Sequence, residues 1–197
     1  ATITATKVLD GKALEADKYE FELKEGDKVV ATAKNAADGT VTFKDIEYAV
    51  AGDHTYTISE KAGSEAGVTY DKSTHNVTVK VVDNGAGKLV ATVTDNNPTF
   101  TNTYKAASAK ATITAKKVLN GKAIEAGQFE FELKENGTVL HTVSNDANGK
   151  IQFPKLTFTK EETRTFTIAE KAGDVAGVEY DPNAYEVTVV VKDNGQG

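Results

Sequence analysis

One stretch of this sequence is written almost twice. Residues 1–16, ATITATKVLDGKALEA, return at residues 111–126 as ATITAKKVLNGKAIEA, and TYTISEKAGSEAGVTYD at 55–71 returns at 165–181 as TFTIAEKAGDVAGVEYD. About half of the overlaid positions are identical, and the period is far longer than the roughly 20–50 residues of solenoid repeats. The chain is therefore expected to contain two tandem copies of one domain.

The boundaries of the copies follow from this alignment and from a short stretch without apolar periodicity. We expect a complete domain at 1–105, a linker at 106–110 and a second domain at 111–197. The second copy has no counterpart of residues 88–104, KLVATVTDNNPTFTNTY, so it is expected to lack its C-terminal strands. Three explanations remain open: the tail was lost or lies outside this stretch of sequence, the chain was cut at this point, or the second copy accepts a separate strand.

Apolar and polar residues alternate through most of the chain, which is typical of strands with one buried face. The run YEFEL at 19–23 is an example, and the tripeptide DNG at 83–85, between two such runs, is a strong hairpin signal. About eight short strands in a complete copy indicate an all-β fold of two tandem immunoglobulin-like (Greek-key) sandwiches.

Several polar residues fall on faces that the alternation assigns to the core. They are Lys7, Glu60 and Asn102 in the first copy, and Lys117 and Glu170 in the second. An unpaired buried ammonium group is very costly, so these residues form a candidate constellation. A solvated strand end, a β-bulge that reverses parity, a lysine that reaches solvent or an ordinary salt bridge explains each residue taken alone.

Three segments carry a resemblance to a known family: ITATKVL at 3–9, TISEKAGSEAGVTYD at 57–71 and TFTNTY at 99–104. They resemble the isopeptide-forming domains of Gram-positive surface proteins, above all the streptococcal T-antigen type of major pilin and its relatives in tandem adhesin stalks. The similarity covers all of the first copy and all of the second copy that is present.

This resemblance implies a spontaneous amide crosslink between the first and last strands, promoted by a buried acid. Carried over to this sequence, Lys7 is the nucleophile, Asn102 the electrophile and Glu60 the catalyst. Lys117 and Glu170 match in the second copy, where the asparagine has no counterpart and no internal bond is expected. Burial disfavours charged forms, which favours a neutral amine that attacks the carboxamide carbon and a protonated acid that hydrogen-bonds the carbonyl oxygen.

Composition and charge argue against several other classes. The net charge of −6 disfavours a nucleic-acid surface, and the absence of cysteine excludes disulfides. The three histidines do not recur in the repeat, and the DNG turns supply too few oxygens for calcium, so neither a metal nor a cofactor is expected. No nucleophile–base pair emerges, so the only chemistry expected is single-turnover bond formation rather than enzymatic turnover.

The resemblance also implies an extracellular location, on the bacterial cell surface, cell wall or pilus, as a structural stalk or shaft segment. The expected partners are neighbouring domains of the same polymer, with a strand donor for the second domain as an alternative, and neither nucleic acid nor membrane insertion. An adhesin module that binds a host protein or glycan is another alternative, which the short connections and the absence of tryptophan disfavour.

Overall fold

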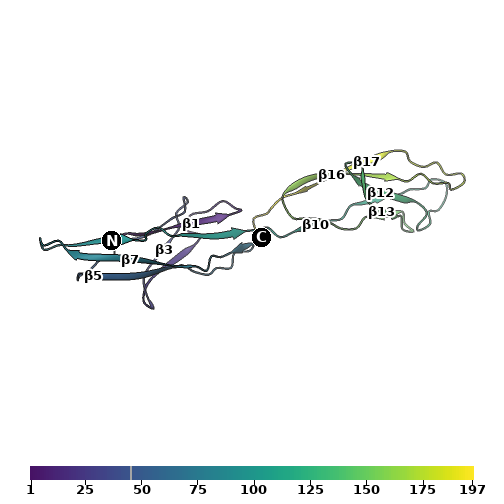
Figure 1. Cartoon of the computed structure of the whole chain (residues 1–197). Helices are drawn as coiled ribbons and strands as arrows, with labels where there is room; N and C mark the ends of the chain where they lie inside the picture. Colours follow the sequence, from purple (N-terminus) through teal and green to yellow (C-terminus); the bar gives the residue numbers. More distant parts are fainter. Residues whose placement is uncertain (45) are drawn as a thin grey trace. The chain divides into compact units, whose positions relative to one another are not determined.

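The computed structural model describes residues 1–44 and 46–197, which form strands and connecting turns without a helix. Contacts divide the chain into two compact units (Figure 1): unit 1 is Ala1–Lys105 with Gln196–Gly197, and unit 2 is Ala106–Gly195. Strand β10, Ala109–Ala111, includes the last two residues of the expected linker and pairs with Leu156–Phe158, so these two residues belong to unit 2. A helix long and apolar enough to cross a membrane does not occur in the described part of the chain.

Unit 1 is a sandwich of two sheets. Its strands are β1 Ile3–Asp10, β2 Glu20–Glu25, β3 Lys28–Lys34, β4 Thr40–Phe43, β5 Gly52–Glu60, β6 Val68–Thr69, β7 Thr74–Asp83, β8 Leu89–Thr94 and β9 Thr99–Tyr104. One sheet has the order β4-β1-β9-β6 and the other the order β3-β2-β5-β7-β8. Alternate residues of both sheets face inward and form one core, in which Phe21, Ile58 and Phe100 are fully buried.

The first and last strands of unit 1 lie side by side. Strands β1 and β9 pair in parallel, with Lys7 opposite Phe100 and Leu9 opposite Asn102. In strand β9 every second residue is buried, including Phe100 and Asn102. The parallel pairing means that β1 begins and β9 ends at opposite ends of the ladder.

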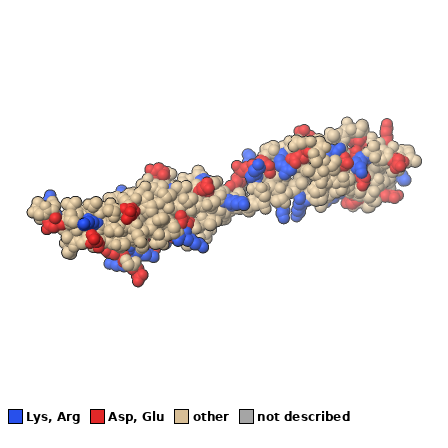
Figure 2. Space-filling view, viewed as in Figure 1, with Lys and Arg blue, Asp and Glu red and all other residues tan. Residues whose placement is uncertain are grey.

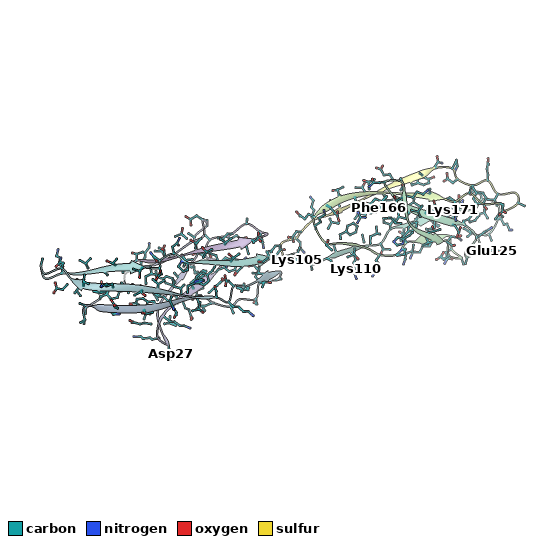
Figure 3. The ribbon with its side chains drawn as sticks, in the orientation of Figure 1. Asp27, Lys105, Lys110, Glu125, Phe166 and Lys171 are labelled. Atoms are coloured by element: carbon teal, nitrogen blue, oxygen red, sulfur yellow. The ribbon has the colours of Figure 1, made fainter. Side chains whose placement is uncertain are left out.

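Unit 2 repeats most of this arrangement. Its strands are β10 Ala109–Ala111, β11 Thr114–Lys116, β12 Glu130–Glu135, β13 Thr138–Ser144, β14 Lys150–Gln152, β15 Leu156–Phe158, β16 Glu162–Glu170 and β17 Ala184–Val191. Four of them form the sheet β13-β12-β16-β17, while β10-β15 and β11-β14 form two short pairs. Phe166, labelled in Figure 3, is one of the aromatic side chains buried in the core of this unit.

The strand that corresponds to β1 is interrupted and shorter in unit 2. Strand β1 continues to Asp10 because its second half pairs with β9, whereas β11 ends at Lys116. No strand equivalent to β8 or β9 is found among the described residues of unit 2. The prediction of two tandem all-β, immunoglobulin-like units is confirmed. Figure 2 shows acidic and basic side chains interspersed on the visible face of each unit.

Candidate functional site

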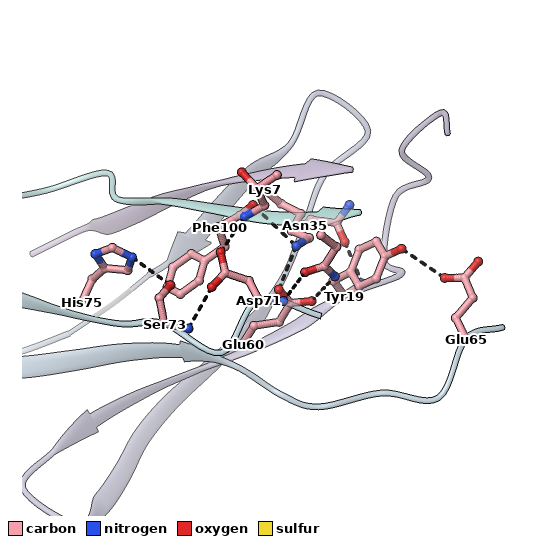
Figure 4. Close-up of polar contacts among 11 residues, drawn as sticks. Lys7, Tyr19, Asn35, Glu60, Glu65, Asp71, Ser73, His75 and Phe100 are labelled. Atoms are coloured by element: carbon pink, nitrogen blue, oxygen red, sulfur yellow. Dashed lines mark hydrogen bonds and ion pairs between the residues drawn. The ribbon is translucent and has the colours of Figure 1, made fainter. Parts of the chain in front are cut away.

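The structure brings Lys7, Glu60 and Asn102 together in the interior of unit 1. The amine Nζ of Lys7 lies 2.8 Å from Oε2 of Glu60, and Nδ2 of Asn102 donates to Oε1 of the same carboxyl group at 2.6 Å. The side chains of Lys7 and Glu60 are fully buried, and Asn102 has an exposed fraction of 0%. Glu60 therefore joins the amine and the carboxamide through its two oxygens. Figure 4 labels Lys7 and Glu60 of this cluster and draws their polar contacts.

Strand register brings these three residues to one place. Glu60 ends strand β5 opposite Phe21 of β2, on the sheet that faces β1 and β9. Lys7 and Asn102 come from neighbouring strands, two positions out of register, so the long lysine side chain reaches along the ladder toward Asn102. The parity of the sequence pattern predicts these inward positions correctly.

A glycine beside Lys7 is part of this placement. The backbone N–H of Lys7 donates to the carbonyl of Gly39 at 2.7 Å, and a Cβ at Gly39 would overlap the carbonyl oxygen of Lys7. Gly39 also has a φ of 87°, which side-chain-bearing residues rarely adopt. Gly149 holds Lys117 by the same contacts in unit 2.

Burial and an aromatic ring set the electrostatics of the amine. Burial lowers the pKa of Lys7, and the hydrogen bond to Glu60 offsets only part of that effect. The ring centroid of Tyr19 lies 4.9 Å from Nζ of Lys7, in the range of a cation–π contact. The lowered pKa favours the neutral amine, which is the form that can act as a nucleophile.

The amide of Asn102 is oriented by a residue that the sequence analysis missed. The backbone N–H of Asp71 donates to Oδ1 of Asn102 at 2.7 Å. Because an N–H can only donate, this contact identifies the carbonyl oxygen and leaves Nδ2 facing Glu60. The contact of Glu60 therefore differs from the expected one, since the acid meets the amide nitrogen rather than the carbonyl oxygen.

Asn35 is a second residue that the sequence analysis missed, and it is 1% exposed. Its Oδ1 accepts the backbone N–H of Tyr19 at 2.8 Å, while its Nδ2 donates to the carbonyls of Glu15 and Ala36. Asn145 makes the equivalent contacts in unit 2, including one from the N–H of Phe129. These asparagines satisfy buried backbone groups and hold Tyr19 and Phe129, whose rings lie near the reactive lysine of each unit.

The corresponding site of unit 2 is open. Nζ of Lys117 lies 2.7 Å from Oε1 and 2.8 Å from Oε2 of Glu170, and its side chain is 11% exposed. Oε1 of Glu170 is buried and makes no hydrogen bond within the described residues, where its contact is the ion pair with Lys117. A groove of about 580 Å³ lies beside this pair, and its lining includes Lys117, Phe131, Glu170, Asp181 and Tyr185.

Other candidate residues fall outside these sites. The lysines that follow the two glutamates face outward, with Lys61 bound to Glu20 and Lys171, labelled in Figure 3, bound to Glu130. Histidine, aspartate and glutamate do not cluster in any group that could hold a metal ion over residues 1–44 and 46–197.

Comparisons with solved structures give the following similarities. The major pilin protein T-13 of Streptococcus pyogenes is 18% identical with a TM-score of 0.43, over 97% of this chain and 90% of that chain. Another major pilin of Streptococcus pyogenes is 17% identical with a TM-score of 0.41, over 87% of this chain and 82% of that chain. The Bacillus anthracis TIE protein is 17% identical with a TM-score of 0.33, over 98% of this chain but only 31% of that chain. No curated protein matches the sequence.

One family model accounts for nearly the whole chain. The model FctA, described as the Spy0128-like isopeptide containing domain, matches residues 3–105 and residues 113–197. The two matches coincide with the two copies of the repeat and with most of units 1 and 2. The chain therefore belongs to the FctA family of Spy0128-like isopeptide-containing domains and carries that domain twice.

Proposed function

We propose that this chain is a load-bearing segment of a Gram-positive cell-surface polymer, a pilus shaft or adhesin stalk, in which unit 1 forms an internal amide bond between Lys7 and Asn102. Membership of an isopeptide-containing family supports the structural role. The observation that carries the bond is the position of Glu60, whose two oxygens contact the amine and the carboxamide nitrogen.

The reaction exchanges one amide for another. Neutral Nζ of Lys7 attacks Cγ of Asn102, a new C–N bond forms, and the Cγ–Nδ2 bond breaks. The proton lost by Nζ passes through Glu60 to Nδ2, which leaves as ammonia, so atoms and charge balance. Both nitrogens already contact the carboxyl group, so this transfer needs little rearrangement. The reaction happens once per molecule, and the protein is its own substrate.

Intact mass tests this proposal directly. The wild-type chain is expected to weigh one ammonia less than its sequence, and a proteolytic digest should contain a branched peptide that joins Lys7 to Asn102. Glu60→Gln is expected to retain the full mass because the proton relay is lost. Glu20→Gln, which changes an outward-facing partner of Lys61, serves as the control and should lose ammonia normally. A wild-type protein of unmodified mass would overturn the proposal.

The open site of unit 2 favours a second function, the covalent capture of a separate strand. In unit 1 the donor to Oε1 of the glutamate is the amide Nδ2 of Asn102, whereas in the described part of unit 2 no amide contacts Oε1 of Glu170, which has its ion pair with Lys117 alone. A strand with the sequence of β9 would supply that donor and fill the groove beside Lys117. We therefore propose that unit 2 accepts such a strand and links its asparagine to Lys117.

A peptide that copies residues 96–104 tests strand capture. Mixed with the full chain, it is expected to give an adduct that survives boiling in detergent and weighs the sum of both molecules less one ammonia. Lys117→Ala should abolish the adduct, and a peptide with alanine at the position of Asn102 should not couple, although it keeps the asparagines of positions 96 and 97. Recovery of the wild-type chain without any adduct would count against this second function while leaving the crosslink of unit 1 untouched.

A further inference from the structure

The carbonyl oxygen of Asn102 has its own hydrogen-bond donor, separate from Glu60. The donor is the backbone N–H of Asp71, 2.7 Å from Oδ1, in the segment between β6 and β7. When an amine adds to an amide carbon, negative charge develops on this oxygen. Donors of oxyanion holes lie about 2.7–3.1 Å from the position that the charged oxygen will occupy, and the Asp71 N–H already contacts this oxygen before the reaction begins.

The equivalent N–H in unit 2 also points into the site, although no counterpart of Asn102 is present there. Asp181 is the equivalent residue, and its backbone N–H donates to Oε2 of Glu170 at 2.9 Å. The same backbone group therefore faces the reactive cluster in both units and binds whichever acceptor is present. The direction of the N–H is a property of the fold rather than a consequence of Asn102.

The side chain of Asp71 holds its own backbone in place (Figure 4). Its Oδ2 accepts the N–H of Thr101 on strand β9 at 2.7 Å, and its Oδ1 accepts the N–H of Ser73 at 2.8 Å. Although burial alone would raise the pKa of Asp71, the hydrogen bonds from Ser73 and Thr101 lower it, so the carboxylate acceptor persists at neutral pH. Thr101 precedes Asn102, so this bond fixes the N–H relative to the amide that reacts.

We propose that the backbone N–H of Asp71 is the oxyanion donor for bond formation at Asn102, and that the Asp71 carboxylate is the positioning group that aims it. This inference rests on the proposed crosslink. As the Nζ–Cγ bond of the crosslink forms, the carbonyl electron pair moves to Oδ1, where the N–H of Asp71 stabilises it. The pair returns as the Cγ–Nδ2 bond breaks and ammonia departs. Glu60 thus moves protons between the two nitrogens, while the backbone N–H of Asp71 stabilises the negative charge on the oxygen.

The rate of crosslinking tests the inference. The full chain is synthesised in a cell-free system with a pulse of labelled amino acid, quenched in acid at intervals, and weighed to follow the loss of ammonia. Asp71→Pro removes the N–H and is expected to slow the reaction about 10²–10³-fold. Asp71→Asn retains the N–H but has one acceptor oxygen in place of two, so it can no longer accept from both Ser73 and Thr101 and a smaller decrease is expected. Asp83→Asn, which alters a similar Asp turn in the exposed hairpin, should react at the wild-type rate.

Two further measurements separate catalysis from folding. Each Asp71 substitution is repeated in a Lys7→Ala background, where denaturant unfolding reports stability without the crosslink. If Asp71→Pro does not fold, the hydrogen bond is tested by NMR in the Lys7→Ala protein, as a scalar coupling between the Asp71 ¹⁵N and the Asn102 ¹³Cγ. The presence of the coupling supports the Asp71 N–H as the donor, and its absence refutes it. Folded Asp71 variants that react at the wild-type rate overturn the inference alone, whereas a wild-type chain that never loses ammonia overturns the crosslink itself.

Discussion

Pulled from its two ends, unit 1 of the wild-type protein is expected to show no unfolding step, whereas Asn102→Ala is expected to unfold and lengthen by roughly 300 Å. The bond from Lys7 to Asn102 would carry force directly from β1 to β9. About 95 residues lie between these positions, and an extended chain spans about 3.3–3.6 Å per residue, which gives the expected length. Single-molecule force spectroscopy of the full chain measures both outcomes.

Unit 2 provides the internal reference for that experiment. It has no internal crosslink partner for Lys117 among its described residues, so its own unfolding step is expected in both proteins. The unfolding step of unit 2 identifies the recordings in which a whole molecule is held between the two attachment points. A wild-type trace that contains a full-length step for each unit would show that force does not pass through the proposed bond.

The second large effect concerns thermodynamic stability. Closing a loop of nearly the whole domain is expected to raise the free energy of unfolding of unit 1 by about 4–5 kcal/mol, as a disulfide of that span does on loop-entropy grounds. For a domain of this size the melting temperature should rise by roughly 20–30 °C over Asn102→Ala. Because the sequence contains no cysteine, a reducing agent should change neither protein.

Calorimetry of the full chain checks this expectation. The transition of unit 2 should remain at one temperature in both proteins, because Asn102 lies outside that unit. Lys7→Ala is expected to be less stable than Asn102→Ala, since it removes a hydrogen-bond partner of the buried Glu60 and leaves a cavity where the lysine side chain was. Equal melting temperatures for unit 1 in the wild type and Asn102→Ala would contradict a covalent closure.

Sequence reasoning succeeded where side-chain direction follows strand parity. Alternation in YEFEL and TFTNTY predicts sheets, and it places Lys7 and Asn102 inside, where the structure finds them. The duplicated sequence predicts the two units for the same reason, because each copy repeats the alternation. The chemical roles of Lys7, Glu60 and Asn102 stay predictions that the mass measurement tests.

The parts of the site that were missed depend on backbone atoms outside the alternating pattern. The donor at Asp71 is an N–H, which every residue except proline has, so nothing in the sequence marks it. Gly39 matters because of its close approach to Lys7, and Asn35 because of the backbone groups it satisfies. Only the folded chain shows which of these groups meet. The contact of Glu60 differs from the expected one because the N–H of Asp71 binds the carbonyl oxygen of Asn102 and leaves its amide nitrogen facing Glu60.

The proposed amide between β1 and β9 would also protect the chain against cleavage at the exposed hairpin between β7 and β8. Residues 84–88 are all exposed, and they lie within the segment that the proposed amide would close into a ring. A protease that cuts this hairpin once would leave both fragments covalently attached to each other, so the chain would remain in one piece. A second cut within the ring would release only the segment between the two cuts, because Lys7 and Asn102 would still join the two ends of the chain. Severing the chain would take a cut outside the ring, for example in the segment that joins successive units.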